Sequence, residues 1–150
     1  MGRLRTALKN RKIYLDANIF IYTLEAAEPW VGTLGNVFNG LNDNEFLAVT
    51  SQLTLSECLV LPFKQNNFDL IKVYREALSP RDNLSISAVD KKVLITAAHI
   101  RAKFGLKLPD AIHAATALTQ KCTGLLTNDP GFKRVSGLDI FVLSDWLDLS

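Results

Sequence analysis

Four acidic residues stand far apart in the chain, each beside a run of apolar residues: Asp16, Glu57, Asp110 and Asp129. A lone carboxylate is costly to bury among apolar side chains, so these positions need an explanation. If the fold brings the four carboxylates together, their charges repel one another until a cation lies between them. Clustered oxygen ligands suit a hard divalent ion, and we therefore expect Mg²⁺ or Mn²⁺ to bind there.

Each acid, taken singly, also has a structural explanation. Asp16 could cap the helix that follows it, and Glu57 could be a surface residue. Asp110 could interact with the N-terminus of its own helix. Asp129 precedes Pro130 and could be a turn residue. The prediction of a site therefore depends on the four acids acting together.

The elements that must position these acids are short apolar runs that alternate with longer amphipathic stretches. Strands are predicted at residues 13–15, 46–50, 84–87, 123–127 and 140–143. Helices are predicted after Asn18, at 31–41, after Ser51 or Thr54, at 67–78, at 88–104 with Gly105 as C-cap, and from Pro109. This alternation predicts an α/β fold with a mainly parallel sheet. Function gathers at the carboxyl ends of such strands. Asp16 and Asp129 fall there, and the early helical turns with Glu57 and Asp110 can point to the same edge.

The composition is that of a soluble globular protein. With 150 residues, of which 48% are apolar and 21% charged, the chain suits one domain with a substantial core. No apolar run approaches the ~20 residues that a membrane-spanning helix needs. Cys58 and Cys122 lie in apolar runs, which predicts buried free thiols in a reducing compartment, and we expect a cytoplasmic protein.

Basic residues gather ahead of the first acid. We interpret residues 1–12 as a basic N-terminal arm and residues 13–150 as a single domain. The basic residues of the arm are Arg3, Arg5, Lys9, Arg11 and Lys12. They could touch phosphates, although a solvated terminus is the simpler interpretation, because the net charge of the chain is only +2.

Four segments around the acids resemble the motifs of one family. They are Tyr14-Leu15-Asp16-Ala17-Asn18, Thr54-Leu55-Ser56-Glu57, Leu108-Pro109-Asp110-Ala111-Ile112-His113-Ala114-Ala115 and Leu126-Thr127-Asn128-Asp129. In this order and spacing they resemble PIN-domain ribonucleases, most closely the VapC-like toxins of type II toxin–antitoxin systems. The resemblance implies a three-layer α/β/α fold and a metal-dependent endoribonuclease that hydrolyses RNA phosphodiester bonds. It also implies a homodimer and a small antitoxin partner, with DNA bound only through the antitoxin complex.

The resemblance also implies a role for each site residue. Asp16 and Asp129 are expected to bind Mg²⁺ or Mn²⁺ directly, and Asp110 and Glu57 to complete the acidic pocket. Asn18 and Thr127 are expected to orient the carboxylates. Lys133 and Arg134 follow the fourth acid closely and could hold RNA phosphate. The segments 31–41 and 67–78 are expected to contribute to the dimer.

Other interpretations remain. The chain could be a stand-alone PIN nuclease, or a catalytically inactive PIN-like module that binds RNA or protein. A phosphate-receiver domain needs paired acids after the first strand, whereas Ala17 follows Asp16 here. A haloacid-dehalogenase-like phosphatase needs an Asp where this chain has Asn18. His113 lies one helical turn after Asp110 and could approach a substrate, but a packing or surface role is the simpler interpretation.

Overall fold

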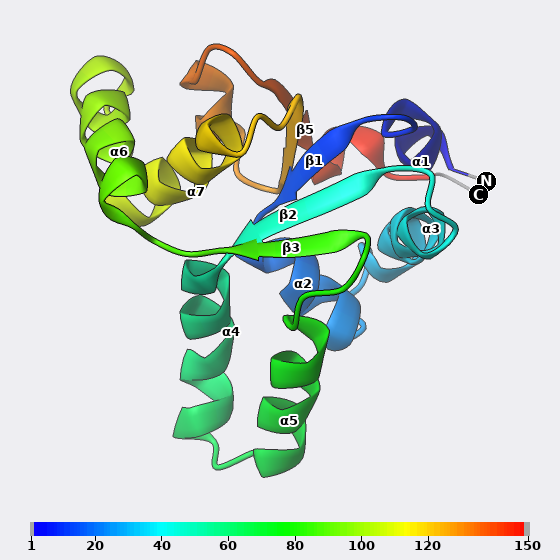
Figure 1. The fold of residues 1–150 in the computed structure, drawn as a ribbon. Helices are drawn as coiled ribbons and strands as arrows, with labels where there is room; N and C mark the ends of the chain where they lie inside the picture. Colours follow the sequence, from blue (N-terminus) through cyan, green and yellow to red (C-terminus); the bar gives the residue numbers. More distant parts are fainter. Residues whose placement is uncertain (1, 149–150) are drawn as a thin grey trace.

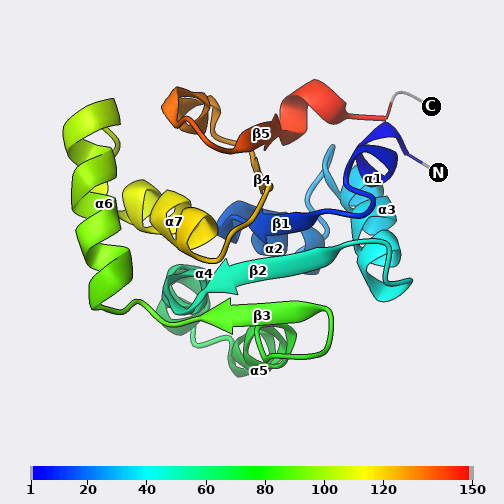
Figure 2. The same ribbon diagram turned by 45° about the horizontal axis from the view of Figure 1, so that its top comes forward.

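The computed structural model describes residues 2–148, and its centre is a five-stranded sheet. The strands are β1 (Lys12–Leu15), β2 (Leu47–Ser51), β3 (Leu84–Ser87), β4 (Gly124–Thr127) and β5 (Asp139–Val142). They lie in the order β3-β2-β1-β4-β5, and every neighbouring pair is parallel (Figure 2). The predicted α/β fold is therefore confirmed, and the carboxyl ends of all five strands meet at one edge.

Helices cover both faces of this sheet (Figure 1). They are α1 (Arg3–Ala7), α2 (Ala17–Leu24), α3 (Val31–Asn42), α4 (Gln52–Lys64), α5 (Phe68–Ala77), α6 (Lys91–Phe104), α7 (Leu108–Thr119) and the short 3₁₀ helices η1 (Pro130–Arg134) and η2 (Leu143–Trp146). Helices α1 to α5 pack into the core on one face, and α6, α7 and η1 form the core on the other. The arrangement is the three-layer α/β/α architecture that the resemblance implies.

Alternation along the strands explains why two cores form. In β1, Ile13 and Leu15 belong to the core under α2 and α3, whereas Tyr14 between them belongs to the core under α7. In β4, Leu126 faces the first core and Leu125 the second. Successive side chains of a strand point to opposite faces, so a strand buried on both sides is a continuous apolar run. These runs are the features that made the strands predictable.

Side-chain caps fix where several helices begin. Ser51 accepts a hydrogen bond from Leu53 N at the start of α4, and Asp90 accepts one from Val93 N at the start of α6. Asp16 is the N-cap of α2, so the helix begins at Ala17 and not after Asn18 as predicted. Gly105 ends α6 with φ of 72°, a left-handed conformation that favours glycine. The caps place the starts of α2 and α4 at the carboxyl edge of the sheet.

The N-terminal arm packs onto the rest of the chain. Leu4 and Leu8 are fully buried in the first core, so the interpretation of this segment as a solvated terminus was wrong. Arg5 pairs with Glu45 at 2.6 Å and with Asp43 at 2.9 Å, and Arg11 pairs with Asp139 at 2.6 Å. These ion pairs engage two of the basic side chains that we considered for phosphate binding.

Both cysteines are free and buried, as predicted. Burial raises the pKa of the Cys58 thiol to about 12 and that of Cys122 to about 11, so both stay protonated and unreactive. In residues 2–148, no helix combines the length and the apolar character that crossing a membrane requires.

Candidate active site at the carboxyl edge of the sheet

Asp16 follows β1 directly and lies beside the end of β4. Leu15 is in register with Leu126, and Asp16 N donates a hydrogen bond to Leu126 O at 3.0 Å. Asp16 is only 6% exposed, and its carboxylate accepts two hydrogen bonds. Ala17 N donates to Oδ1 at 2.7 Å, and Thr127 Oγ1 donates to Oδ2 at 2.7 Å. These bonds fix both oxygens, so Asp16 caps α2 and is also held by the neighbouring strand.

Asp129 lies two residues beyond Thr127, and the same hydroxyl connects it to Asp16. Asp129 N donates to Thr127 Oγ1 at 3.0 Å, and Asp129 Oδ1 accepts from Gly131 N at 2.8 Å. The turn before Pro130, which the sequence offered as a structural explanation, is present. It leaves Asp129 at the same edge of the sheet as Asp16.

Asp110 reaches this edge from the first turn of α7. Burial raises the pKa of its carboxyl, and the negative charges of Asp129, Asp16 and Glu57 raise it further, while His113 opposes the shift. Charges act in this way only at short range. The four acids therefore share one electrostatic environment, although they come from separate parts of the chain.

Glu57 extends from α4 and meets His113 of α7. Glu57 Oε1 lies 2.5 Å from His113 Nε2, and Asp16 Oδ1 lies 3.6 Å from the same nitrogen. The imidazole is 1% exposed, and Tyr14 Oη lies 2.6 Å from Nδ1. Burial acts to lower the pKa of His113, but the hydrogen bond to Glu57 and the charges of Asp16, Glu57 and Asp110 together raise it.

The donor set could hold a metal ion. Asp16, Glu57 and His113 each offer one ligand atom, and these three atoms lie within 4.8 Å of one another. Asp110 adds a carboxylate whose pKa is raised by burial and by the other acids. A divalent cation would offset this repulsion, and carboxylate oxygens suit such an ion.

The remaining predicted residues have different surroundings. Asn18 lies in the first turn of α2, and its side chain makes no hydrogen bond within residues 2–148. Lys133 and Arg134 lie in η1, directly after Asp129. Lys133 Nζ pairs with Asp145 at 3.1 Å, and Arg134 Nε donates to Gly131 O at 3.2 Å. Both basic side chains are next to the acidic cluster in the sequence.

His113 is the member of the cluster that the sequence interpretation underestimated. It is buried, as a packing residue would be, but both ring nitrogens lie within hydrogen-bonding distance of polar side chains. The available signal was its spacing from Asp110, because residues three apart share one face of a helix. That signal was weak, because most of this helix is buried whatever the role of His113. The other small buried residues are Ala111, Ala114, Ala115, Thr116 and Ala117.

Comparisons with known proteins agree with this geometry. The family model described as the PIN domain matches residues 13–138 of the chain. No curated protein matched the sequence.

Several solved structures share the fold. A toxin–antitoxin complex from Klebsiella pneumoniae has 23% identity and a TM-score of 0.63, and the match covers 84% of this chain and 94% of that one. VapBC2 from Rickettsia felis, bound to a DNA fragment from its promoter, has 18% identity and a TM-score of 0.66, with 86% and 96% covered. VapC20 from Mycobacterium tuberculosis, a toxin that cleaves the sarcin–ricin loop, has 14% identity and a TM-score of 0.69, with 86% and 98% covered. The chain belongs to the PIN-domain family.

Proposed function

We propose that this protein is a metal-dependent endoribonuclease whose active site is the acidic cluster of Asp16, Glu57, Asp110 and Asp129. The observation that carries the proposal is geometric: ligand atoms of Asp16, Glu57 and His113 converge within 4.8 Å at the carboxyl edge of a PIN-domain sheet, and Thr127 connects Asp16 to Asp129. Structural explanations of single acids do not account for this convergence. Asp110 in particular is placed where its charge is unfavourable, which is a common feature of functional sites.

Mg²⁺ or Mn²⁺ is the ion that these ligands suit. Such an ion lowers the pKa of a bound water and offsets charge that develops on the phosphate. Asp16 and Asp129 would hold it directly, with Asp110 and Glu57 completing the pocket. Thr127 keeps the Asp16 carboxylate in one orientation by donating to Oδ2. Asn18, in the first turn of α2, would orient the pocket through water.

RNA is the proposed substrate, and its phosphates need positive charge beside the acids. Lys133 and Arg134 are the nearest basic side chains along the chain to Asp129. Lys133 and its partner Asp145 are each 55% exposed, and exposed pairs of this kind are weak enough to exchange for a phosphate. We assign both residues to contact with the RNA backbone.

A small antitoxin is the proposed partner. The similar structures from Klebsiella pneumoniae and Rickettsia felis are described as toxin–antitoxin assemblies. The acidic cluster of this chain would accept an arginine of the partner through charge-assisted hydrogen bonds, which would compete with metal and RNA. DNA would be bound only by the complex. If no such partner exists, the chain is a stand-alone PIN nuclease. If the purified protein binds no metal, it is a catalytically inactive module that binds RNA or protein.

A homodimer is proposed as well, but on a different surface from the one predicted. Within residues 2–148, helix α3 carries no large apolar side chain of high exposure, and we therefore favour another surface over the segment 31–41. Helix α6 instead carries Leu94, 45% exposed, and Ile95, 62% exposed, on the same face as exposed Ala98 and Ala102. A flat apolar stripe of this kind suits close packing against its own symmetry copy.

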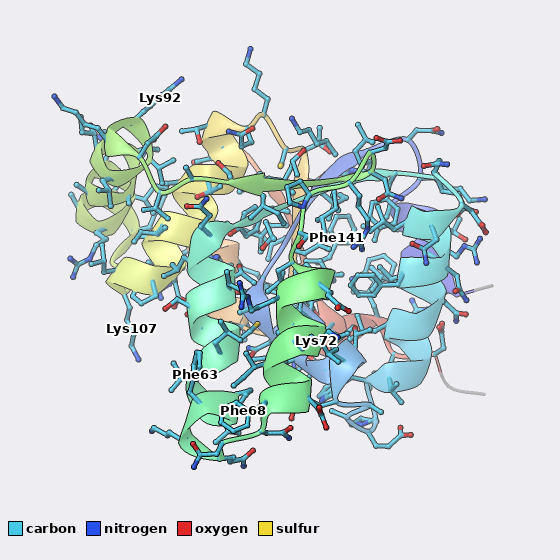
Figure 3. The ribbon with its side chains drawn as sticks, turned by 60° about the horizontal axis from the view of Figure 1, so that its bottom comes forward. Phe63, Phe68, Lys72, Lys92, Lys107 and Phe141 are labelled. Atoms are coloured by element: carbon cyan, nitrogen blue, oxygen red, sulfur yellow. The ribbon has the colours of Figure 1, made fainter. Side chains whose placement is uncertain are left out.

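The α4–α5 hairpin carries a second group of exposed apolar residues. Phe63, 58% exposed, and Phe68, 72% exposed, lie near each other where the two helices join, away from the sheet (Figure 3). The hairpin includes the predicted segment 67–78. We assign it to the antitoxin and α6 to the dimer.

A circular RNA tests the proposed activity, because it has no ends for an exonuclease. Purified protein with Mn²⁺ or Mg²⁺ should convert the circle to linear fragments, and excess chelator should stop the reaction. Adding back metal should restore it. Equal cleavage in excess chelator would refute metal dependence, and cleavage of linear RNA alone would refute endonuclease action.

A further inference from the structure

His113 uses both of its ring nitrogens inside the protein. Nδ1 lies 2.6 Å from Tyr14 Oη, and Nε2 lies 2.5 Å from Glu57 Oε1. A buried imidazole has one nitrogen on each side that needs a polar partner, so the identity of those partners shows what the ring connects. The two contacts connect the interior of the sheet, through the ring, to an acid at the site.

A chain of buried hydroxyl groups beside Tyr14 determines the direction of these bonds. Thr50 Oγ1 donates to Leu15 O at 2.8 Å, so its proton is used. Thr54, which lies 2.8 Å from Thr50 Oγ1, must then be the donor in that pair. Within residues 2–148, His113 Nδ1 is the one side-chain partner of the Tyr14 hydroxyl at hydrogen-bonding distance. Tyr14 therefore donates to Nδ1 in the neutral ring and accepts from it in the charged ring, and in both states Nε2 carries the proton that faces the Glu57 carboxylate.

A proton on Nε2 assigns His113 a different role from that of a metal ligand. A protonated ring nitrogen has no free electron pair for a metal, but it donates a hydrogen bond to Glu57. Glu57 needs such a contact to keep one orientation, because its side chain is 35% exposed and can otherwise turn into solvent. Within residues 2–148, His113 is its one hydrogen-bond partner. Asp16, by contrast, is already held by Ala17 N and Thr127.

We propose that His113 is a positioning residue that holds Glu57 over Asp16, with Tyr14 fixing the ring so that Nε2 is the donor. The inference rests on the proposed function, since it gives Glu57 its place in the metal site. In this arrangement His113 of α7 is the partner of the Glu57 carboxylate, in the same way that Thr127 of β4 is the partner of the Asp16 carboxylate. Metal affinity then depends on an imidazole that does not touch the metal.

Two amide substitutions of His113 distinguish the role of Nδ1 from the role of Nε2. The amide of glutamine reaches about as far as Nε2, whereas that of asparagine reaches only as far as Nδ1. His113→Asn therefore keeps a partner for Tyr14 and loses the donor to Glu57. His113→Gln keeps the donor to Glu57, and combining it with Tyr14→Phe avoids a buried hydroxyl without a partner.

Calorimetric titration with Mn²⁺ alone, without RNA, gives the decisive comparison. His113→Asn should lower Mn²⁺ affinity about 10- to 100-fold, as the loss of an orienting group does. The Tyr14→Phe/His113→Gln protein should retain most of the wild-type affinity. Glu57→Gln should weaken binding too, and adding His113→Asn to it should cause no further loss, because both changes remove one interaction.

Three results would overturn the inference. Equal loss in the asparagine and glutamine variants, with nitrogen coupling to Mn²⁺ in pulsed electron paramagnetic resonance, would make His113 a metal ligand. Wild-type Mn²⁺ affinity in His113→Asn, with only a lower melting temperature, would make it a packing residue. Failure of the wild-type protein to bind Mn²⁺ at all would remove the proposed function together with the inference, and is distinct from both other results.

Discussion

Thr127 is the residue that joins the two strand-end acids, because its single hydroxyl donates to Asp16 and accepts from the backbone of Asp129. The side chain is fully buried, so water cannot replace either bond. A carboxylate held in this way presents its remaining electron pairs in one direction. A metal site needs this property more than it needs additional charge.

Thr127→Val keeps the shape of the side chain and removes both bonds. Mn²⁺ affinity should fall about 10- to 100-fold. The free energy of unfolding should fall by about 1–3 kcal/mol, because Asp129 N and Asp16 Oδ2 lose a buried partner. Titration calorimetry and thermal melts measure the two effects. The matched control is Thr96→Val on α6, which should change neither the Mn²⁺ affinity nor the free energy of unfolding. Unchanged metal affinity in Thr127→Val would refute the role of Thr127.

Asp110 makes the stability of the metal-free protein depend on pH. Burial and the charges of Asp129 and Asp16 raise the pKa of this carboxyl in the folded state. The unfolded chain therefore releases the proton at lower pH than the folded protein. The free energy of unfolding falls as pH rises through this interval and stays lower above the folded pKa.

Asp110→Asn should remove that loss. In chelator at neutral pH, the variant should melt higher than wild type, by on the order of 2 °C for a chain of this size. The difference should disappear below the unfolded pKa, at about 3.9. Melts followed by circular dichroism over this range test the sign; a lower melting temperature for the variant at neutral pH would show that the acids do not repel one another.

The acids could be predicted from the sequence, but their contacts could not. Asp16 and Asp129 follow apolar strands, and the parallel arrangement then puts them at one edge. The hydrogen bond from His113 to Glu57 depends on how far α4 and α7 extend over that edge, which no local pattern determines. Asp16 rather than Asn18 caps α2, because Asp16 is the residue at which β1 ends and the helix begins.

Among the α-helices and strands of residues 2–148, α1 is the element that the sequence did not predict, and the short 3₁₀ helices η1 and η2 were not predicted either. Five residues are too few to show a helical repeat, and the basic side chains suggested a solvated arm. Burial of Leu4 and Leu8 holds α1 against α3, and the guanidinium of Arg5 is the main reason that the pKa of Glu45 is lowered. By contrast, the strands and Gly105 were predictable, because buried runs and a left-handed C-cap are local signals.

Leu8→Ala tests the contribution of α1 to stability. The side chain is fully buried, and its truncation should lower the free energy of unfolding by about 2–5 kcal/mol. The neighbouring exposed Lys9→Ala should change it by less than about 0.5 kcal/mol. Urea denaturation measures both. Equal stability of Leu8→Ala and wild type would show that the arm is not part of the folded core.

For the molecule as a whole, the two groups of exposed apolar residues are the surfaces that we propose for a dimer and an antitoxin. The stripe on α6 lies on the helix that precedes α7, whereas Phe63 and Phe68 lie at the far end of the α4–α5 hairpin (Figures 1 and 3). Two separate surfaces would let a dimer and an antitoxin bind at the same time. The sequence placed the dimer at segments 31–41 and 67–78, but it could not show α6, because the exposure of a helix face depends on how the helix packs on the sheet.

Ile95→Glu places a charge in the centre of the α6 stripe. Wild-type protein should have the mass of a dimer in light scattering at micromolar concentration, and the variant should have the mass of a monomer, because a buried unpaired charge is strongly unfavourable. Phe68→Glu adds the same charge to the hairpin and should remain dimeric. A monomeric wild type would contradict the dimer, and a monomeric Phe68→Glu with a dimeric Ile95→Glu would move the interface to the hairpin.

The central claim is that the acidic cluster performs RNA cleavage, and the rate of single-turnover cleavage by Asp16→Asn in saturating Mn²⁺ tests it most directly. This change keeps the shape of the side chain and removes one charge from the cluster. The rate should fall by at least about 100-fold, while circular dichroism shows an intact fold. Asp69→Asn, the same change at an exposed position of α5, should cleave at the wild-type rate. Wild-type cleavage by a folded Asp16→Asn protein would contradict the account.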